Sequence, residues 1–265
     1  MAIEFTTLAS GSAGNCVYVG TENTKILIDA GLSGVKIENL LKQINVSPDM
    51  LDAIFITHEH LDHIDGVGVL SRRYNLPVYA TEGTWGNMPQ KVGEIATKNK
   101  NIVYADEKIF LNDLYLIPFA MPHDAKEPVS YSVYSNNIKI SVATDMGHVT
   151  KDVIEHIRHS DAIILESNHD VTMLKNGTYP ANLKERILGN YGHISNEISA
   201  KLLACVMNNK LKNVFLAHIS KENNTPDLAY LTVKNTLDEF GIKVKKDIDI
   251  HIAKDYGITE LIKLG

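Results

Sequence analysis

Residues 57–66 read Thr-His-Glu-His-Leu-Asp-His-Ile-Asp-Gly and bring four metal-binding side chains, His58, His60, Asp62 and His63, into six positions. Only 11 histidines occur in the 265-residue chain, and three of them lie here. Imidazole nitrogens and carboxylate oxygens are ligands that suit zinc and its first-row neighbours. A single ion does not need four ligands from one short turn. The spacing therefore predicts two ions, one held by His58 and His60 and the other by Asp62 and His63.

Short apolar runs along the chain must supply the scaffold for these ligands. The runs are rich in Val, Ile, Tyr and Phe and are bounded by Gly, Asn or Asp, which predicts strands. Between them, apolar spacing of three and four residues predicts helices. Strands interspersed with helices favour sheets that carry helices on their outer faces. The predicted strands are 3–8, 16–19, 25–28, 53–56, 114–118, 130–134, 138–143, 162–165, 214–217 and 248–252. The predicted helices are 38–43, 64–74, 151–157, 183–188, 196–207 and 227–240.

Three further candidate ligands come directly after predicted strands, as His58 does. Asp145 follows the run 138–144, His218 follows 214–217 and His123 follows 114–121. Each of them alone could be an ordinary polar residue of the core or surface, but their matching locations favour one shared cleft. We expect His58, His60 and His123 to hold the first ion, and Asp62, His63 and His218 the second. Asp145 and a water-derived hydroxide would bridge the two ions.

Composition is that of an ordinary globular enzyme, with 44% hydrophobic and 22% charged residues. Two cysteines do not make a disulfide framework and suit a reducing compartment. The N-terminal residues have no basic region and no long apolar core, and no apolar run reaches the ~20 residues of a membrane helix. We therefore expect a cytoplasmic protein without a membrane partner. A net charge of −6 argues against a generally basic nucleic-acid surface, although bound cations would add positive charge at the site.

The string His58, His60, Asp62, His63 resembles the His-x-His-x-Asp-His ligand motif of the metallo-β-lactamase fold. Asp29, which ends the predicted strand 25–28, resembles the first acidic motif of that family, which supports the ligand loop and does not bind metal. His123, Asp145 and His218 match the later ligand motifs. The resemblance implies a four-layered αββα sandwich and two divalent metal ions, with zinc favoured and manganese or iron as alternatives.

Five blocks are similar to the YycJ (WalJ) subfamily of this fold, which implies a 5′→3′ exonuclease-like activity on DNA and a link to mismatch repair. They are residues 8–16, 122–125, 166–170, 192–196 and 218–224.

Two spacings bear on domain organisation. His123 and Asp145 are only 22 positions apart, too few for the substrate-gripping arm of tRNA 3′-processing relatives. Only 73 residues separate Asp145 from His218, too few for a β-CASP insert. We therefore expect one domain over 1–265, with neither addition.

The resemblance also suggests roles around the metal ions. Asp62 would orient the hydroxide or accept its proton, and His193 in Gly-His-Ile-Ser would protonate the leaving 3′-oxygen. His169 would face the same cleft, while Ser195 and Asn196 offer hydrogen bonds beside a helix N-terminus that attracts phosphate. A structural role in a capping loop is the alternative for His193 and His169.

Basic residues near the late motifs could follow a nucleic-acid backbone, namely Lys175, Lys184, Arg186 and Lys221. Solvated surface side chains are the alternative. Two functions therefore remain open. One is a dinuclear-metal exonuclease acting on DNA. The other is a small-molecule hydrolase of the same fold, such as a cyclic-nucleotide phosphodiesterase or a thioesterase.

Overall fold

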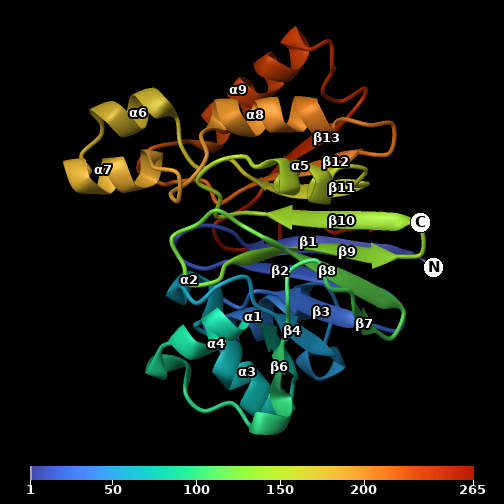
Figure 1. The fold of residues 1–265 in the computed structure, drawn as a ribbon. Helices are drawn as coiled ribbons and strands as arrows, with labels where there is room; N and C mark the ends of the chain where they lie inside the picture. Colours follow the sequence, from blue (N-terminus) through green and yellow to red (C-terminus); the bar gives the residue numbers. More distant parts are fainter. Residues whose placement is uncertain (1) are drawn as a thin grey trace. The chain divides into compact units, whose positions relative to one another are not determined.

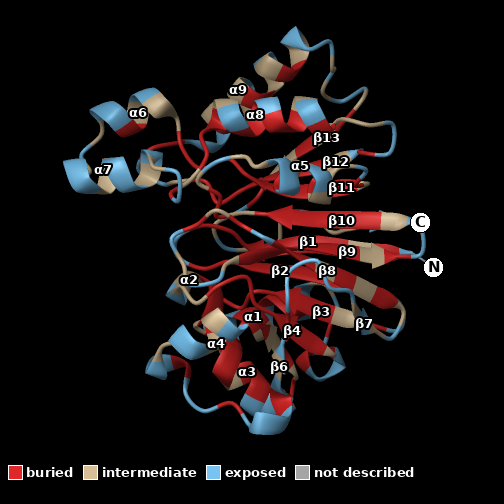
Figure 2. Ribbon diagram, in the orientation of Figure 1, coloured by how far each residue is buried: buried red, intermediate tan, exposed pale blue. Residues whose placement is uncertain are grey.

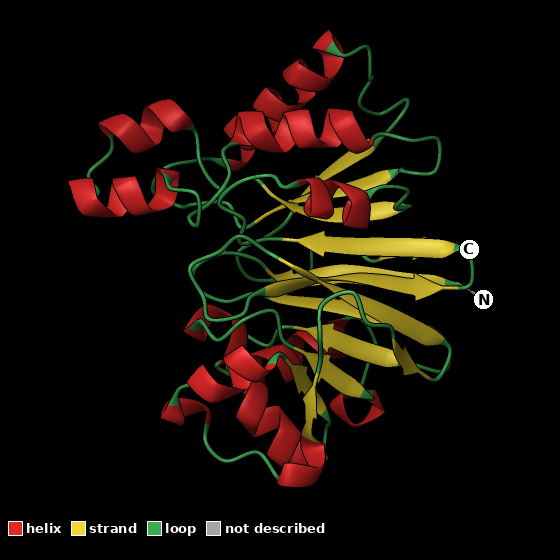
Figure 3. Cartoon of the chain, viewed as in Figure 1, coloured by secondary structure: helices red, strands yellow, loops and turns green. Residues whose placement is uncertain are grey.

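The computed structural model describes residues 2–265, whose strands form two seven-stranded sheets (Figures 1 and 3). The order in the first sheet is β14-β1-β2-β3-β4-β5-β6, and in the second it is β13-β12-β11-β10-β9-β8-β7. Both sheets are mixed, because β3–β6 and β10–β13 pair in parallel whereas β1–β3 and β7–β8 pair antiparallel. Within residues 2–265, no helix is both long and apolar enough to cross a membrane.

The bounds of the elements follow the predicted ranges closely where the apolar runs are long. The strands are β1 Ile3–Ala9, β2 Cys16–Gly20, β3 Lys25–Ile28, β4 Ala53–Phe55, β5 Val78–Ala80, β6 Lys100–Ile102, β7 Ile109–Leu111, β8 Leu114–Ala120, β9 Val129–Ser135, β10 Ile138–Ala143, β11 Ala162–Glu166, β12 Asn213–Ala217, β13 Asp249–Ile252 and β14 Ile262–Leu264. The α-helices are α1 Gly34–Gln43, α2 Leu61–Ile64, α3 Val67–Tyr74, α4 Glu82–Asn87, α5 Lys151–Ile157, α6 Val171–Asn176, α7 Ala181–Leu188, α8 Asn196–Val206 and α9 Pro226–Glu239. Three short 3₁₀ turns, η1 Pro48–Met50, η2 Gln90–Val92 and η3 Thr97–Asn99, complete the set.

The chain forms two compact units. Unit 1 comprises residues 2–118, 125–138 and 254–265, and unit 2 comprises 119–124 and 139–253. The prediction of a single domain without inserted arm or β-CASP segment stays a prediction.

In unit 1, α1 and α3 pack on the sheet of β1–β6. Their apolar side chains, such as Ile37 and Leu70, are buried in one core with Leu27, Ile54 and Val78 of the strands. Figure 2 shows β1–β4 coloured mostly as buried, and α3 with both buried and exposed stretches. Burying apolar surface in this way is the main favourable contribution to folding. This packing fixes the edge of the sheet from which the His58–His63 segment leaves.

In unit 2, the parallel strands β10–β13 carry α5, α8 and α9. Leu203 of α8 and Val233 of α9 join Ile163 and Val214 of the strands in one apolar core. By contrast α6 and α7 form a hairpin that lies apart from these helices (Figure 1), and no residue of α7 is buried. The parallel strands hold their carboxyl ends at one edge, where the site residues of this unit lie.

Three candidate site residues come directly after strands in a left-handed backbone conformation. Asp29 follows β3 with φ 61°, and Asp145 and His218 lie just beyond β10 and β12 with φ 59° and 54°. Such angles are uncommon outside glycine and concentrate at functional sites. Each of these strands therefore ends in a sharp turn that directs its polar side chain away from the line of the strand.

The predicted helix 64–74 is wrong as a single element. The chain forms α2 and α3 and breaks at Asp65 and Gly66. Gly66 donates its N–H to the carbonyl of Ala30, and a β-carbon at this position would lie 2.3 Å from the carbonyl oxygen of Leu32. Close backbone approach therefore interrupts an apolar pattern that is continuous in sequence. Predicted elements also omit the three-residue strands β5, β6, β7 and β14 and the short helices α2, α4 and α6.

Candidate metal centre

In unit 1, Asp29 ties together both ends of the His58–His63 loop. Its carboxylate accepts hydrogen bonds from the N–H and the hydroxyl of Thr57, both at 2.8 Å, and lies 2.7 Å from Nδ1 of His63. Burial raises the pKa of the Asp29 carboxyl, and the charge and hydrogen bonds of His63 and Thr57 oppose that rise. Asp29 therefore contacts residues at both ends of the loop, and its role in supporting metal binding stays a prediction.

The imidazoles of this loop are oriented by their Nδ1 atoms. Thr57 Oγ1 lies 2.9 Å from Nδ1 of His58, and Oδ2 of Asp29 lies 2.7 Å from Nδ1 of His63. These contacts favour a proton on Nδ1 and leave Nε2 as the ring nitrogen that can bind an ion, the usual arrangement when a second group fixes a metal-binding histidine. In His63 this Nε2 lies within hydrogen-bond distance of Nδ2 of Asn15. Nε2 of His58 lies 3.1 Å from Nδ1 of His60. Two tetrahedral zinc ligands would be about 3.3 Å apart, so the pair fits one ion.

The Gly-rich turn 10–15 packs directly on the loop. The N–H of Asn15 donates to the carbonyl of Asp62 at 2.7 Å, and its Nδ2 lies 3.0 Å from Nε2 of His63. Gly31 permits this approach, because a β-carbon there would lie 1.7 Å from the Asp62 carbonyl oxygen. Side-chain oxygen Oδ2 of Asp62 lies 3.6 Å from Nε2 of His63, so these two predicted ligands of one ion are neighbours.

In unit 2, four side chains each place one potential ligand atom within 4.8 Å of all the others. They are Asp145, Glu166, His193 and His218. Oδ1 of Asp145 lies 3.5 Å from Nδ1 of His218 and 3.8 Å from Nδ1 of His193. All four come from the carboxyl edge of β10, β11 and β12 or from the loop before α8. Carboxylates and imidazoles in this mixture fit a divalent first-row ion.

Glu166, the last residue of β11, holds the group together. Its Oε1 lies 2.7 Å from Nδ1 of His193 and 3.1 Å from Nδ1 of His218, and its Oε2 accepts the N–H of Met146 at 2.8 Å. Burial would raise the pKa of this carboxyl, but the charges and hydrogen bonds of His193 and His218 outweigh that effect and hold the pKa below its usual range. Glu166 is thus a buried carboxylate that contacts Nδ1 of both rings, so that Nε2 of each ring is the nitrogen turned away from Glu166.

Sequence reasoning missed Glu166 as a functional residue. A signal was present, because Glu166 directly follows the apolar run 162–165, just as Asp145 and His218 follow theirs.

His123 also belongs to unit 2. Its Nδ1 lies 3.2 Å from the carbonyl oxygen of Gly192, and its Nε2 lies 3.9 Å from Oδ1 of Asp145. Burial lowers the pKa of His123, an effect only partly offset by Asp145. The neutral imidazole that results is the form that binds a metal ion.

The predicted substrate-binding residues lie in different surroundings. Ser195 caps α8 by accepting the N–H of Ile198, and the Asn196 side chain is fully buried in hydrogen bonds with Asn224. His169 is 1% exposed, and among residues 2–265 its Nδ1 has no hydrogen-bond partner. Lys221 is exposed in the loop after β12. Their contact with substrate stays a prediction.

Both units contribute candidate ligands. Those of unit 1 are His58, His60, Asp62 and His63, and those of unit 2 are His123, Asp145 and His218, with Glu166 and His193 beside them.

A family model for the beta-lactamase superfamily domain matches residues 24–219, and the chain belongs to this superfamily. It is 43% identical over 251 residues to exodeoxyribonuclease YycJ of Bacillus anthracis, covering 95% of each chain. It is 39% identical over 266 residues to exodeoxyribonuclease WalJ of Streptococcus pneumoniae serotype 2 (strain D39 / NCTC 7466), covering 100% of this chain and 99% of the relative.

Among solved structures, the metallo-beta-lactamase fold protein YhfI from Bacillus subtilis matches with a TM-score of 0.71 and 15% identity, over 97% of this chain and 99% of that one. This similarity confirms the predicted metallo-β-lactamase fold. The two full-length relatives confirm the predicted resemblance to the YycJ and WalJ proteins.

Proposed function

We propose that this protein is a dinuclear-metal phosphodiesterase that degrades DNA strands from the 5′ end and serves DNA repair. Two relatives of nearly equal length, 43% and 39% identical, are exodeoxyribonucleases, which supports DNA as the substrate. The observation that carries the proposal is that one oxygen of the buried Glu166 carboxylate contacts both His193 and His218. These contacts connect a candidate proton donor, His193, to a candidate metal ligand, His218.

We assign His58, His60 and His123 to one ion, Asp62, His63 and His218 to the other, and Asp145 to both. The assignment rests on the family ligand motif and on the contacts that engage Nδ1 of His58, His63 and His218 and so assign Nε2 of these rings to the ions. Zinc suits this mixture of imidazole and carboxylate, and manganese or iron would also fit it.

The ions, when bound, would supply a hydroxide at neutral pH and neutralise the charge of the phosphodiester. Asp62 would orient the attacking oxygen. His193 would donate the proton from Nε2 to the leaving 3′-oxygen, since its Nδ1 faces Glu166. Its side chain is 19% exposed, whereas those of Asp145 and His218 are 5% and 6% exposed. Within this group His193 is therefore the residue that a bound strand can reach.

The α6–α7 hairpin supports a path for the DNA backbone, because it ends five residues before His193 and carries Lys175, Lys184 and Arg186. The side chain of Arg186 is 58% exposed although it pairs with Asp124. Lysine and arginine contacts to phosphate release counterions, so affinity for DNA should fall with added salt. Lys221 would add a further contact to the backbone.

The test is digestion of duplex and single-stranded DNA carrying a 5′-phosphate, with metal-loaded protein. Release of mononucleotides from the 5′ end, blocked by phosphorothioate linkages there, is the expected result. Release from the 3′ end would overturn the polarity. Intact DNA alongside turnover of cyclic nucleotides or thioesters would identify a small-molecule hydrolase instead.

A further inference from the structure

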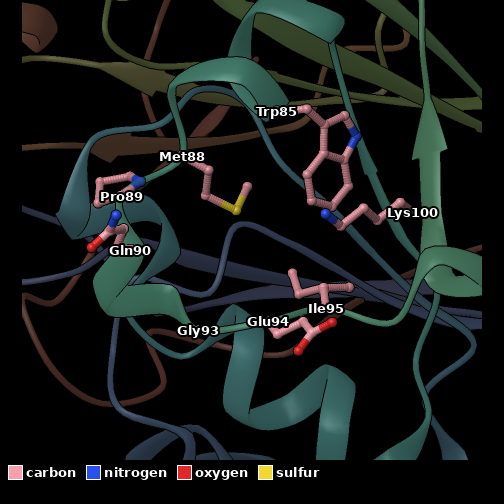
Figure 4. Close-up of a pocket in the computed structure, with 8 residues that line it drawn as sticks. All are labelled: Trp85, Met88, Pro89, Gln90, Gly93, Glu94, Ile95 and Lys100. Carbon is pink, nitrogen blue, oxygen red and sulfur yellow. The ribbon is translucent and has the colours of Figure 1, made fainter.

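A groove in unit 1 lies beside the metal-binding loop but outside it. The cavity of about 270 Å³ is bounded by Trp85, Met88, Pro89 and Ile95, with Lys100 and Glu94 at its margin (Figure 4). Figure 4 shows Trp85 and Lys100 on one side of this groove and Met88 and Pro89 on the other. Its walls are α4, η2 and β6, none of which is used in the proposed hydrolysis.

Trp85 is held in a fixed orientation in this groove. Its Nε1 donates to the carbonyl of Asn101 at 3.0 Å, and the ammonium group of Lys100 lies 5.5 Å from the ring centroid. The ring also packs against the apolar core of unit 1. A rigid indole whose face carries a cation is a surface on which another flat aromatic group can stack.

Two contacts tie the walls of the groove to the metal-binding loop. Glu59, between His58 and His60, accepts the hydroxyl of Thr84 in α4 at 3.4 Å and the N–H of Lys126 at 2.8 Å. Asp65, two residues after His63, pairs with Lys91 of η2 at 2.6 Å. The groove and the loop are therefore connected by direct contacts within unit 1.

The charges around the groove favour a nucleobase inside it and a phosphate group at its margin. Residues 88–100 contain three lysines and one glutamate in a chain of net charge −6. The glutamate, Glu94, lines the margin of the groove, where its carboxylate would repel a phosphate that entered and would accept hydrogen bonds from the amino groups of a base. Lys98 and Lys100 are exposed and can meet a phosphate at the margin.

We propose that this groove binds one unpaired nucleobase of a DNA strand by stacking it on Trp85. The base would replace the Lys100 ammonium group on the indole, and that ammonium group would then pair with the adjoining phosphate. The proposal rests on DNA as the substrate and adds to it a binding site for a nucleotide outside the metal centre.

Trp85 is the single tryptophan of the chain, so its fluorescence reports on this groove alone. A short single-stranded oligonucleotide should quench the emission, with EDTA present and again with metal-loaded His193→Ala protein, so that the strand stays intact. Trp85→Leu should weaken binding of a dye-labelled strand about fivefold to a hundredfold, as loss of one stacked base does, and Trp85→Phe should retain most of it. Lys100→Gln should weaken binding without loss of the fluorescence signal.

The outcome separates this proposal from the proposed function. If the strand quenches Trp85 emission but the metal-loaded, unaltered protein hydrolyses no DNA, the groove is upheld and the nuclease proposal is refuted. Unchanged Trp85 emission, whether or not the strand binds elsewhere on the protein, overturns the groove even if the protein digests DNA. Equal strand affinity of Trp85→Leu, Lys100→Gln and the unaltered protein overturns it as well.

Discussion

Oε1 of Glu166 lies 2.7 Å from Nδ1 of His193, and the same oxygen lies 3.1 Å from Nδ1 of His218. One ionised carboxylate thus favours a proton on Nδ1 of both rings. In the proposed function, Nε2 of His193 would face the substrate and Nε2 of His218 an ion. Because the carboxylate is fully buried, its orientation is set by the protein interior and not by solvent.

Glu166→Gln should lower kcat for DNA about 10- to 100-fold, the range found when a partner of a metal ligand is removed. The amide keeps the shape of the side chain but removes the negative charge that faces Nδ1 of His193 and of His218. In a double variant with His193→Ala the two losses should combine to less than their product, because the part of the Glu166 effect that acts through His193 is already gone while the part through His218 remains. If the fold-losses in kcat of Glu166→Gln and His193→Ala multiply in the double variant, the proposed coupling between these two residues is contradicted.

His193→Ala should lower kcat on DNA about 10²- to 10⁴-fold, the usual contribution of a positioned proton donor. On bis(p-nitrophenyl) phosphate the loss should be small, because that leaving group needs no proton. The contrast between the two substrates is the measurement. A similar loss on both would assign His193 to metal binding and not to proton transfer.

Asp29→Asn should weaken metal binding about 10- to 100-fold, since the carboxylate orients His63 and Thr57 of the ligand loop. Metal content after dialysis against graded chelator measures the effect. Asp49→Asn makes the same chemical change at an exposed position of unit 1 and serves as the matched control. Equal metal content in the two variants would show that Asp29 does not support the loop.

Lys139 should make stability depend on alkaline pH. Burial lowers its pKa to about 8, whereas its ordinary value is 10.5. Between these values the unfolded chain binds more protons than the folded one, so the free energy of unfolding rises with pH across this window, by up to about 3 kcal/mol from this group. Lys139→Met removes the group, and urea unfolding at pH 7 and pH 10 should show a smaller rise than in the unaltered protein. Parallel pH profiles for the two proteins would contradict the shift.

Much of the fold could be predicted from sequence. The continuous apolar run 162–165 corresponds to β11, because a strand buried on both faces favours such a stretch. The run 138–143, in which Lys139 and Ser141 alternate with apolar residues, corresponds to β10. The short strands β6 and β7 lack that signal, since their residues are half-buried or exposed and only pairing with neighbours makes them strands. Gly66 shows the converse, because tertiary contact with residues 30–32 broke a helix that local spacing favoured.

The sequence by itself determined the family and the His58–His63 ligand segment, because those ligands are so close in the chain that one turn brings them together. It also indicated Asp145, His123 and His218, since side chains that follow strands project from a sheet edge. Only the tertiary structure decided the part played by Glu166 and the groove around Trp85. Both depend on parallel strand pairing and on loop packing between distant segments, and neither leaves a periodic pattern in the residues themselves.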